Sequence, residues 1–269
     1  MLGTIILYIL ASIIFGQVVL AMLVLCPRCK LVSPNLVRLP QTAIARREIA
    51  LTFDDGPHEE ITPQILDHLD LYNAKATFFC IGEKVAAYPD LVAEIIRRGH
   101  GVENHSYRHH TFFAFGSPNL LENDISKTQK MIETATHGIA PRFFRAPFGF
   151  RSPFLGRVLR RMSLRHVAWT RRGYDTICRN PDTVFRRLSR KLAPGDILLL
   201  HDGNSRRSTT GHAAVLDVLP RLLELCKHKK LHSVSLSMIF TDTQTLPQIC
   251  NQSSTGDRGD HRSSTNALS

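Results

Sequence analysis

The stretch Leu-Thr-Phe-Asp-Asp-Gly-Pro, residues 51–57, is the one around which the rest of this chain is organised. Residues 49–53 are mostly apolar and predict a short buried strand, which the Gly-Pro pair ends in a turn. The strand leads directly into two adjacent carboxylates, Asp54 and Asp55. Such neighbours repel each other unless a cation or a hydrogen-bond donor stabilises one of them. The pair therefore requires partners elsewhere, unless Asp-Asp-Gly-Pro is only a solvated turn, which all four residue types favour.

Apolar segments of strand length alternate with helical patterns from residue 49 onward. Helices have clear starts where a capping side chain precedes a proline, which occurs at Thr62, Ser117, Ser152 and Asn180. The alternation is typical of a parallel sheet covered by helices, and a length of 269 residues favours its closure into a barrel over residues 49–245. Seven strands are expected, at residues 49–53, 76–81, 101–104, 143–146, 166–169, 196–200 and 232–236.

The first 25 residues differ from everything that follows. Residues 2–25 carry no charged side chain, and a helix of that length spans about 36 Å, more than the hydrocarbon core of a bilayer. We expect a transmembrane helix within residues 1–27, then a basic juxtamembrane linker at residues 28–48. The basic residues after the helix place the remaining chain on the cytoplasmic side of a bacterial inner membrane. They are Arg28, Lys30, Arg38, Arg46 and Arg47.

The formal net charge of +11 limits the classes of partner. Only 7% of residues are aromatic and the basic residues are scattered, so we expect no nucleic acid as a partner. Anionic lipid headgroups or a phosphate-bearing substrate explain the positive charge at least as well as nucleic acid does. The six cysteines show no spacing typical of a disulfide framework, which fits a reducing compartment. The polar residues 246–269 lack apolar periodicity and are expected to form a disordered tail.

Polar side chains follow the ends of the predicted strands, and the carboxyl ends of parallel strands meet at one edge of a sheet. His105 and His109 follow the third strand four residues apart, so a helical turn would point both imidazoles at one metal ion. Asp55 would complete a set of two histidines and a carboxylate, which leaves positions open for water and substrate. Three further polar residues lie at or after other strands, although each alone fits a salt bridge, a helix cap or a core position: Arg145, Asp175 and His201.

Five motifs in order strongly resemble the NodB-homology polysaccharide deacetylases, the family 4 carbohydrate esterases. The motifs are T-F-D-D-G-P, H-S-x-x-H, R-x-P-F-G, W-x-x-x-x-x-D and L-L-x-H, and the resemblance spans residues 49–240. It implies a distorted (β/α)7 barrel, a divalent metal ion and hydrolysis of the N-acetyl group of an amino sugar. Zn²⁺ is the metal expected first, while Co²⁺, Ni²⁺ and Mn²⁺ also suit two histidines and a carboxylate.

The resemblance also implies a role for each matching residue. Asp54 would be the general base that deprotonates a water molecule, and His201 the acid that protonates the departing amine. Arg145 would orient the base, and Asp175 would pair with His201 and tune its pKa. The implied metal ligands are Asp55, His105 and His109, and the implied substrate-binding residues are Pro147, Phe148, Gly149 and Leu199.

Two implied details concern substrate binding. The backbone N–H of Phe148 would stabilise the charged carbonyl oxygen, and Leu199 would form a wall of the acetyl pocket. The family usually has Trp after the motif-four Asp, whereas Thr176 stands here, so another wall is altered or supplied elsewhere.

The predicted topology leads to a hypothesis about the substrate. An amino sugar carried on polyprenyl phosphate at the cytoplasmic face would be reachable, which is similar to the subgroup that deacetylates polyprenyl-phospho-amino sugars. The membrane and this lipid-linked sugar are then the expected partners. The main alternative is an outward-facing polysaccharide or peptidoglycan deacetylase. A non-catalytic carbohydrate-binding protein that kept the fold is a further alternative, from another functional class.

Overall fold

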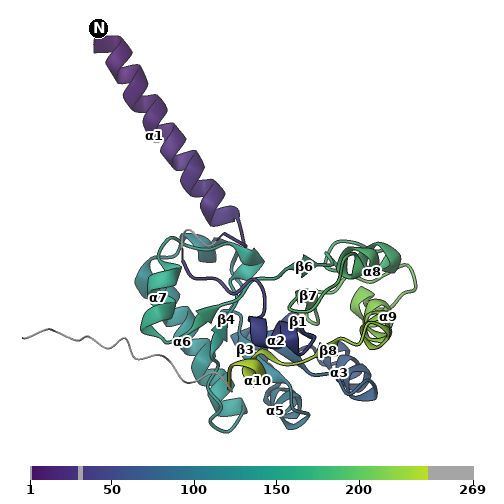
Figure 1. The fold of residues 1–269 in the computed structure, drawn as a ribbon. Coiled ribbons are helices and arrows are strands. Elements are labelled where there is room, and N and C mark those ends of the chain that lie inside the picture. The colour runs from purple at the N-terminus through teal and green to yellow at the C-terminus, as the bar shows by residue number, and fades with distance from the viewer. Residues whose placement is uncertain (1, 30–32, 242–269) are drawn as a thin grey trace, which may run out of the picture.

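A single sheet of eight parallel strands forms the centre of the computed structural model, which describes residues 2–29 and 33–241. The strand order is β5-β4-β3-β2-β1-β7-β6, and β8 also pairs with β1 (Figure 1). The strands are β1 Glu48–Gly56, β2 Ala76–Cys80, β3 Gly101–Asn104, β4 Phe143–Phe144, β5 Arg165–His166, β6 Arg171–Arg172, β7 Ile197–His201 and β8 His232–Ser233.

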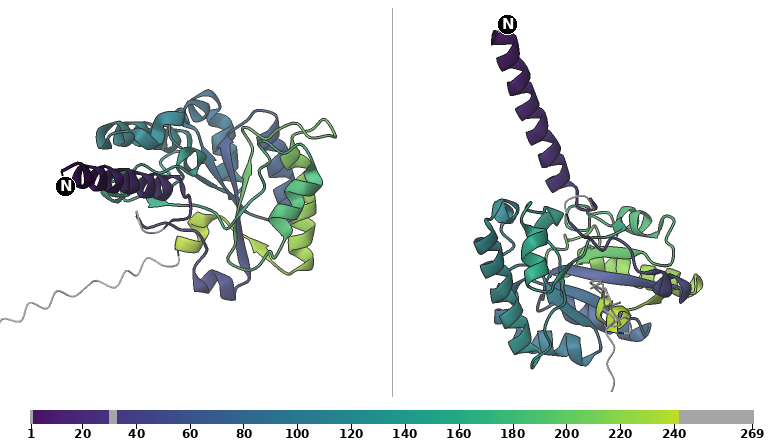
Figure 2. Two further views of the ribbon diagram at one scale, coloured as in Figure 1. Left: turned by 90° about the horizontal axis from the view of Figure 1, so that it is seen from above. Right: turned by 60° about the vertical axis from the view of Figure 1, so that its left-hand side comes forward.

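The helices surround this sheet and α1 extends away from it (Figure 2). They are α1 Leu2–Leu25, α2 Gln41–Ala45, α3 Ile61–Leu71, α4 Gly82–Ala87, α5 Pro89–Arg97, α6 Pro118–Ala135, α7 Leu155–Arg161, α8 Pro181–Ser189, α9 Ala214–His228 and α10 Leu236–Thr241, with 3-10 turns η1 Thr111–Phe115 and η2 Pro147–Gly149.

The prediction of a closed barrel is wrong, because the curled sheet stays open as a half-barrel. Its edge strands β5 and β6 are not paired with each other in the described parts of the chain. Both are only two residues long, which gives few ladder hydrogen bonds for closing a ring. Leu36 lies against the chain just after β5, where its N–H donates to the His166 carbonyl and its carbonyl accepts from Ala168.

Part of the predicted linker at residues 28–48 is therefore built into the domain. Leu39 and Ala43 are fully buried and pack in the same apolar cluster as Trp169 and Leu199. Arg38 forms an ion pair with the buried Asp196 at 2.9 Å. These contacts tie the segment to the inner side of the sheet by burial of apolar side chains, which its basic composition did not indicate.

Each of the seven predicted strands overlaps an observed strand, and one further strand, β6, was missed. β6 consists of Arg171 and Arg172, so it has neither apolar alternation nor length to mark it. It pairs in parallel with β7, where Arg171 lies opposite Leu198.

Successive side chains along β1 point to opposite faces of the sheet. Ile49, Leu51 and Phe53 pack in the large cluster beneath the outer helices, where Phe53 stacks on Phe78 at 5.1 Å between ring centroids. The intervening residues Thr52 and Asp54 therefore face the inside of the curled sheet. The large buried cluster thus fixes the register that points Asp54 into the half-barrel.

Helix α1 has the bounds predicted for the N-terminal apolar segment, and its side chains from residues 3–19 are exposed. No helix in the part of the chain described here is both long and apolar enough to cross a membrane. The predicted transmembrane helix is therefore not supported. The predicted disordered tail, residues 246–269, lies outside the described residues.

Candidate active site

A cavity of about 380 Å³ opens at the carboxyl ends of β1, β3 and β7. The parallel ladder places Asp54 of β1 directly opposite His201 of β7. The two strand ends lie so close that a Cβ on Gly203 would stand 1.8 Å from the Asp55 carbonyl oxygen, so only glycine fits there. Most predicted site residues line this cavity: Asp54, Asp55, His105, His109, Phe148, Gly149, Leu199 and His201.

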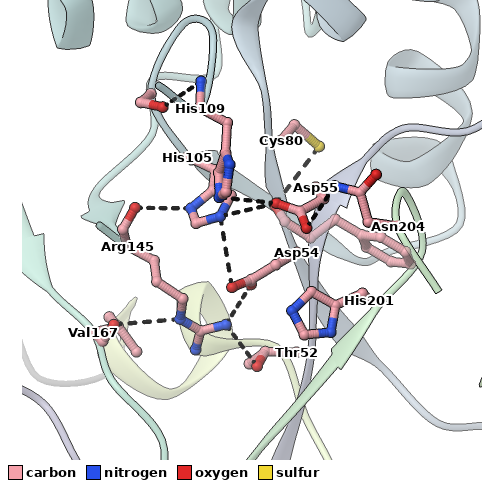
Figure 3. Close-up of polar contacts among 12 residues, drawn as sticks. Thr52, Asp54, Asp55, Cys80, His105, His109, Arg145, Val167, His201 and Asn204 are labelled. Carbon is pink, nitrogen blue, oxygen red and sulfur yellow. Dashed lines mark hydrogen bonds and ion pairs between the residues drawn. The ribbon is translucent and has the colours of Figure 1, made fainter. Parts of the chain in front are cut away.

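Asp55, His105 and His109 form a compact ligand set (Figure 3). The Asp55 Oδ1 atom lies 3.2 Å from His105 Nε2 and 3.3 Å from His109 Nε2. This carboxylate oxygen is buried and has no hydrogen-bond partner among the described residues. Two imidazole nitrogens and one carboxylate oxygen that face the same point fit a divalent cation. The predicted ligand set is thus assembled as a candidate metal site.

The two histidines reach each other through a turn and not through the helix expected from their spacing. Residues 105–110 contain no helix, and the His109 N–H donates to Ser106 Oγ at 3.1 Å. Asp55, Ser106, His109 and Phe148 all have a positive φ, between 52° and 71°. Left-handed backbone is costly for residues other than glycine and is concentrated at functional sites.

The orientation of His105 is set by its second ring nitrogen. His105 Nδ1 lies 2.8 Å from the carbonyl oxygen of Arg145, to which it donates. The Nε2 lone pair is then free to face Asp55 and a bound cation. Arg145 thus contributes to the metal site through its backbone.

Arg145 also binds Asp54 through its side chain. Its Nη1 atom donates to Asp54 Oδ1 at 2.5 Å and to Thr52 Oγ1 at 2.9 Å. The guanidinium is fully buried and lies over the Phe79 ring at 4.0 Å. Burial lowers the pKa of Arg145, while the Asp54 carboxylate opposes this shift. A charged hydrogen bond from a fixed donor leaves Asp54 few alternative orientations.

Asp175 holds His201 at two points. Its Oδ2 accepts from the backbone N–H of His201 at 2.8 Å, and its Oδ1 lies 2.9 Å from His201 Nδ1. Burial disfavours the imidazolium, but Asp175, with Asp54 and Asp55, outweighs it and raises the pKa of His201 to about 9. His201 is therefore protonated at neutral pH and can act as an acid.

The pKa values of Asp55 and His109 are both shifted below their usual ranges. Burial alone would raise the pKa of Asp55, but the three nearby histidines hold it well below its usual range. Burial and the neighbouring His105 lower the pKa of His109 to about 4, so its imidazole is neutral at pH 7. Neutral imidazole and ionised carboxylate are the forms that bind a metal ion.

Two supporting residues were missed from the sequence. Asn204 donates from Nδ2 to Asp55 Oδ2 at 3.0 Å, and Lys84 donates from Nζ to the Asp55 carbonyl oxygen at 2.6 Å. Asn204 follows His201 by three residues, so the argument from strand ends could have found it. Lys84 lies in α4 and had no such signal.

The remaining wall of the cavity is formed by residues that the sequence motifs did not assign to substrate binding. Thr176 and Ile177 line it together with Trp169 and Arg172, so the side chains on this wall come from the segment after β5. Pro147 does not line the cavity, although it was predicted to bind substrate, and is buried in η2. The backbone of Phe148 follows it with φ 56°, and the Phe148 ring lies 4.5 Å from that of His109.

Comparisons with known proteins agree with this geometry. The family model described as polysaccharide deacetylase matches residues 42–167. A peptidoglycan-N-acetylglucosamine deacetylase of Bacillus cereus is 36% identical over 176 residues, 65% of this chain and 81% of that protein. A chitooligosaccharide deacetylase of Azorhizobium caulinodans is 34% identical over 162 residues, 58% of this chain and 73% of that protein.

A solved structure is similar over most of the described domain. It is the Bc1960 peptidoglycan N-acetylglucosamine deacetylase in complex with an N-hydroxybenzamide, with a TM-score of 0.68 and 30% identity. The similarity covers 77% of this chain and 92% of the other.

Proposed function

Because the chain belongs to the polysaccharide deacetylase family and is a metal-dependent amino-sugar N-deacetylase, we propose that its substrate is an N-acetylglucosamine unit of a glycan such as peptidoglycan. The observation that carries this proposal is one cavity lined by the metal-ligand set, by Asp54 and by His201. Arg145 pairs with Asp54, and Asp175 pairs with His201. The names of the relatives indicate the substrate class.

The proposed chemistry follows from the positions of the side chains. A divalent cation held by Asp55, His105 and His109, for which we propose Zn²⁺, would polarise the acetyl carbonyl and lower the pKa of a bound water. Asp54 accepts the proton of the attacking water, and Arg145 keeps its carboxylate oriented towards the cavity.

His201 acts on the other side of the acetamido group. It donates a proton to the departing amine, which would otherwise leave as a poor anionic leaving group. The backbone N–H of Phe148 stabilises the oxyanion, and Leu199, which is 2% exposed, contacts the acetyl methyl.

A lipid-linked sugar is the weaker candidate for the substrate. It rested on the placement of the catalytic domain in the cytoplasm, which remains a prediction from the basic residues after α1. A peptidoglycan substrate lies on the other side of the membrane. The relatives named for peptidoglycan or chitooligosaccharides support a glycan, so the substrate itself decides between the two placements.

Acetate release measured by mass spectrometry distinguishes these substrates. We expect release from peptidoglycan glycan strands and from a soluble N-acetylglucosamine oligomer, and at least about tenfold less from a polyprenyl-phosphate N-acetylhexosamine, because binding to several sugar units lowers KM. Release from the lipid-linked sugar alone would overturn the proposal and restore the cytoplasmic hypothesis.

The alkaline limb of the pH profile should depend on Asp175. With a pKa of about 9, His201 carries the proton it must donate below that pH and loses it above. Asp175→Asn removes the negative charge that raises this pKa, so the limb should move to lower pH by about one unit or more. The measurement is kcat against pH. Asp182→Asn, at an exposed ion pair with Arg221, is the control, and an unchanged limb in Asp175→Asn would contradict the pairing.

A further inference from the structure

The two arginines of β6 have opposite environments. Arg171 is fully paired, since its Nε donates to Asp196 Oδ2 at 2.6 Å and its other nitrogens donate to the Arg190 and Lys191 carbonyls. Arg172, the next residue on the strand, faces the other way and lines the active-site cavity.

The guanidinium of Arg172 forms no hydrogen bond or ion pair with the described residues. Its Nε atom is buried without a partner. The guanidinium is positioned by aromatic rings, at 5.4 Å from the Trp169 centroid and 4.8 Å from the Tyr174 centroid. Stacking fixes the plane of a guanidinium without using its N–H donors, which stay available to a ligand.

The surroundings of Arg172 favour an anion. Arg145 is a second positive charge that interacts with Arg172, and the repulsion between them contributes to the lowered pKa of Arg145. The carboxylate Asp54 is already bonded to Arg145, and Asp55 belongs to the metal-ligand set. A partly buried arginine without an acceptor is costly unless a ligand supplies one.

We propose that Arg172 binds an anionic group, a carboxylate or a phosphate, carried next to the N-acetyl sugar whose acetamido group enters the cavity. This inference deepens the proposed function and rests on it. Arg172 lies beside Trp169 and Leu199 on the wall of the same cavity, so an anion bound there is attached to the reacting sugar or to its neighbour. A planar guanidinium matches the oxygens of either group with two parallel hydrogen bonds.

Two matched pairs of substrates test the proposal and separate the sources of the anion. One pair is an N-acetylglucosamine disaccharide whose second sugar carries a lactyl ether carboxylate, with its methyl ester. The other is N-acetylglucosamine 1-phosphate with the neutral methyl glycoside. We expect a kcat/KM at least about tenfold higher for the charged member of one pair, which corresponds to about 1.4 kcal/mol. The pair that shows the preference identifies the anion.

Variants assign this preference to one side chain. Arg172→Gln should reduce the charged-to-neutral ratio to near one, and Arg172→Lys should keep part of it. Arg187→Gln is the matched control, because Arg187 also lies over the Tyr174 ring, at 5.3 Å, but does not line the cavity. Equal rates within both pairs for the unaltered protein, or a preference that survives Arg172→Gln, would overturn the proposal.

Binding can be measured without turnover, which separates this inference from the proposed function. Trp169 is the only tryptophan of the chain and lies beside Arg172, so its fluorescence reports on ligands at this wall. We expect the charged member of one pair to bind about tenfold more tightly, and Arg172→Gln to remove the difference. Charge-dependent binding without acetate release would contradict the proposed function alone, and acetate release without charge-dependent binding would contradict this inference alone.

Discussion

Asp54→Asn should lower kcat by about 10²–10⁴-fold, the usual contribution of a general base. An amide cannot accept the proton of the attacking water, although it keeps the size and shape of the carboxylate. The metal content should stay the same, because Asp55, His105 and His109 are unaltered. Acetate release under saturating substrate, together with metal analysis of the same sample, makes the measurement.

The stability of this variant must be measured alongside its activity. Asp54 is the charge partner of the fully buried Arg145, and removal of one member of a buried pair costs about 3–5 kcal/mol. The assay is therefore run at a temperature below the lowered unfolding midpoint of the variant, at which circular dichroism shows that the variant is folded. A folded, metal-loaded Asp54→Asn protein with activity within tenfold of the original would contradict the role of Asp54 as base.

His109→Ala should remove both the metal and the activity. The substitution leaves two of the three metal ligands. Loss of a residue that only hydrogen-bonds to a ligand typically lowers metal affinity by about 10–100-fold, so we expect loss of a ligand itself to lower it by more than about 100-fold. The His109 side chain is 14% exposed and belongs to none of the apolar clusters, so the fold should persist. Metal retained after gel filtration, with acetate release, is the measurement.

The neighbouring histidine provides the matched control. His110 is exposed and lies outside the ligand set, so His110→Ala should keep metal and activity. Stoichiometric metal in His109→Ala, or metal loss in both variants, would contradict the assignment of His109.

The sequence predicted the strands well where each was long and buried, and failed where the fold depends on contacts distant in the chain. β1 and β7 are apolar runs whose ends are marked in the sequence by polar residues, so both were predicted. β6 has two residues and both are arginines, which no pattern marks as a strand. Closure of the sheet would require β5 to pair with β6. Leu36 from the N-terminal segment instead pairs with Val167, just after β5.

The site was predictable to the extent that its residues end strands or belong to a motif. Asp54, Asp55 and His201 end paired parallel strands, so their meeting follows from strand order alone. Lys84 bonds to the Asp55 carbonyl and Arg172 lines the same cavity, but a lysine within α4 and a polar two-residue strand carry no signal of their own. Their positions follow only from the three-dimensional fold.

Removal of acetyl groups from a glycan in this cavity can be tested directly. The most direct test measures acetate and new free amines released from an N-acetylglucosamine oligomer by the metal-loaded protein, with Asp54→Asn beside it. We expect equal amounts of acetate and amine from the unaltered protein and a loss of about 10²–10⁴-fold in the variant. Neither product from the folded, metal-loaded protein, or equal yields from both proteins, would contradict it.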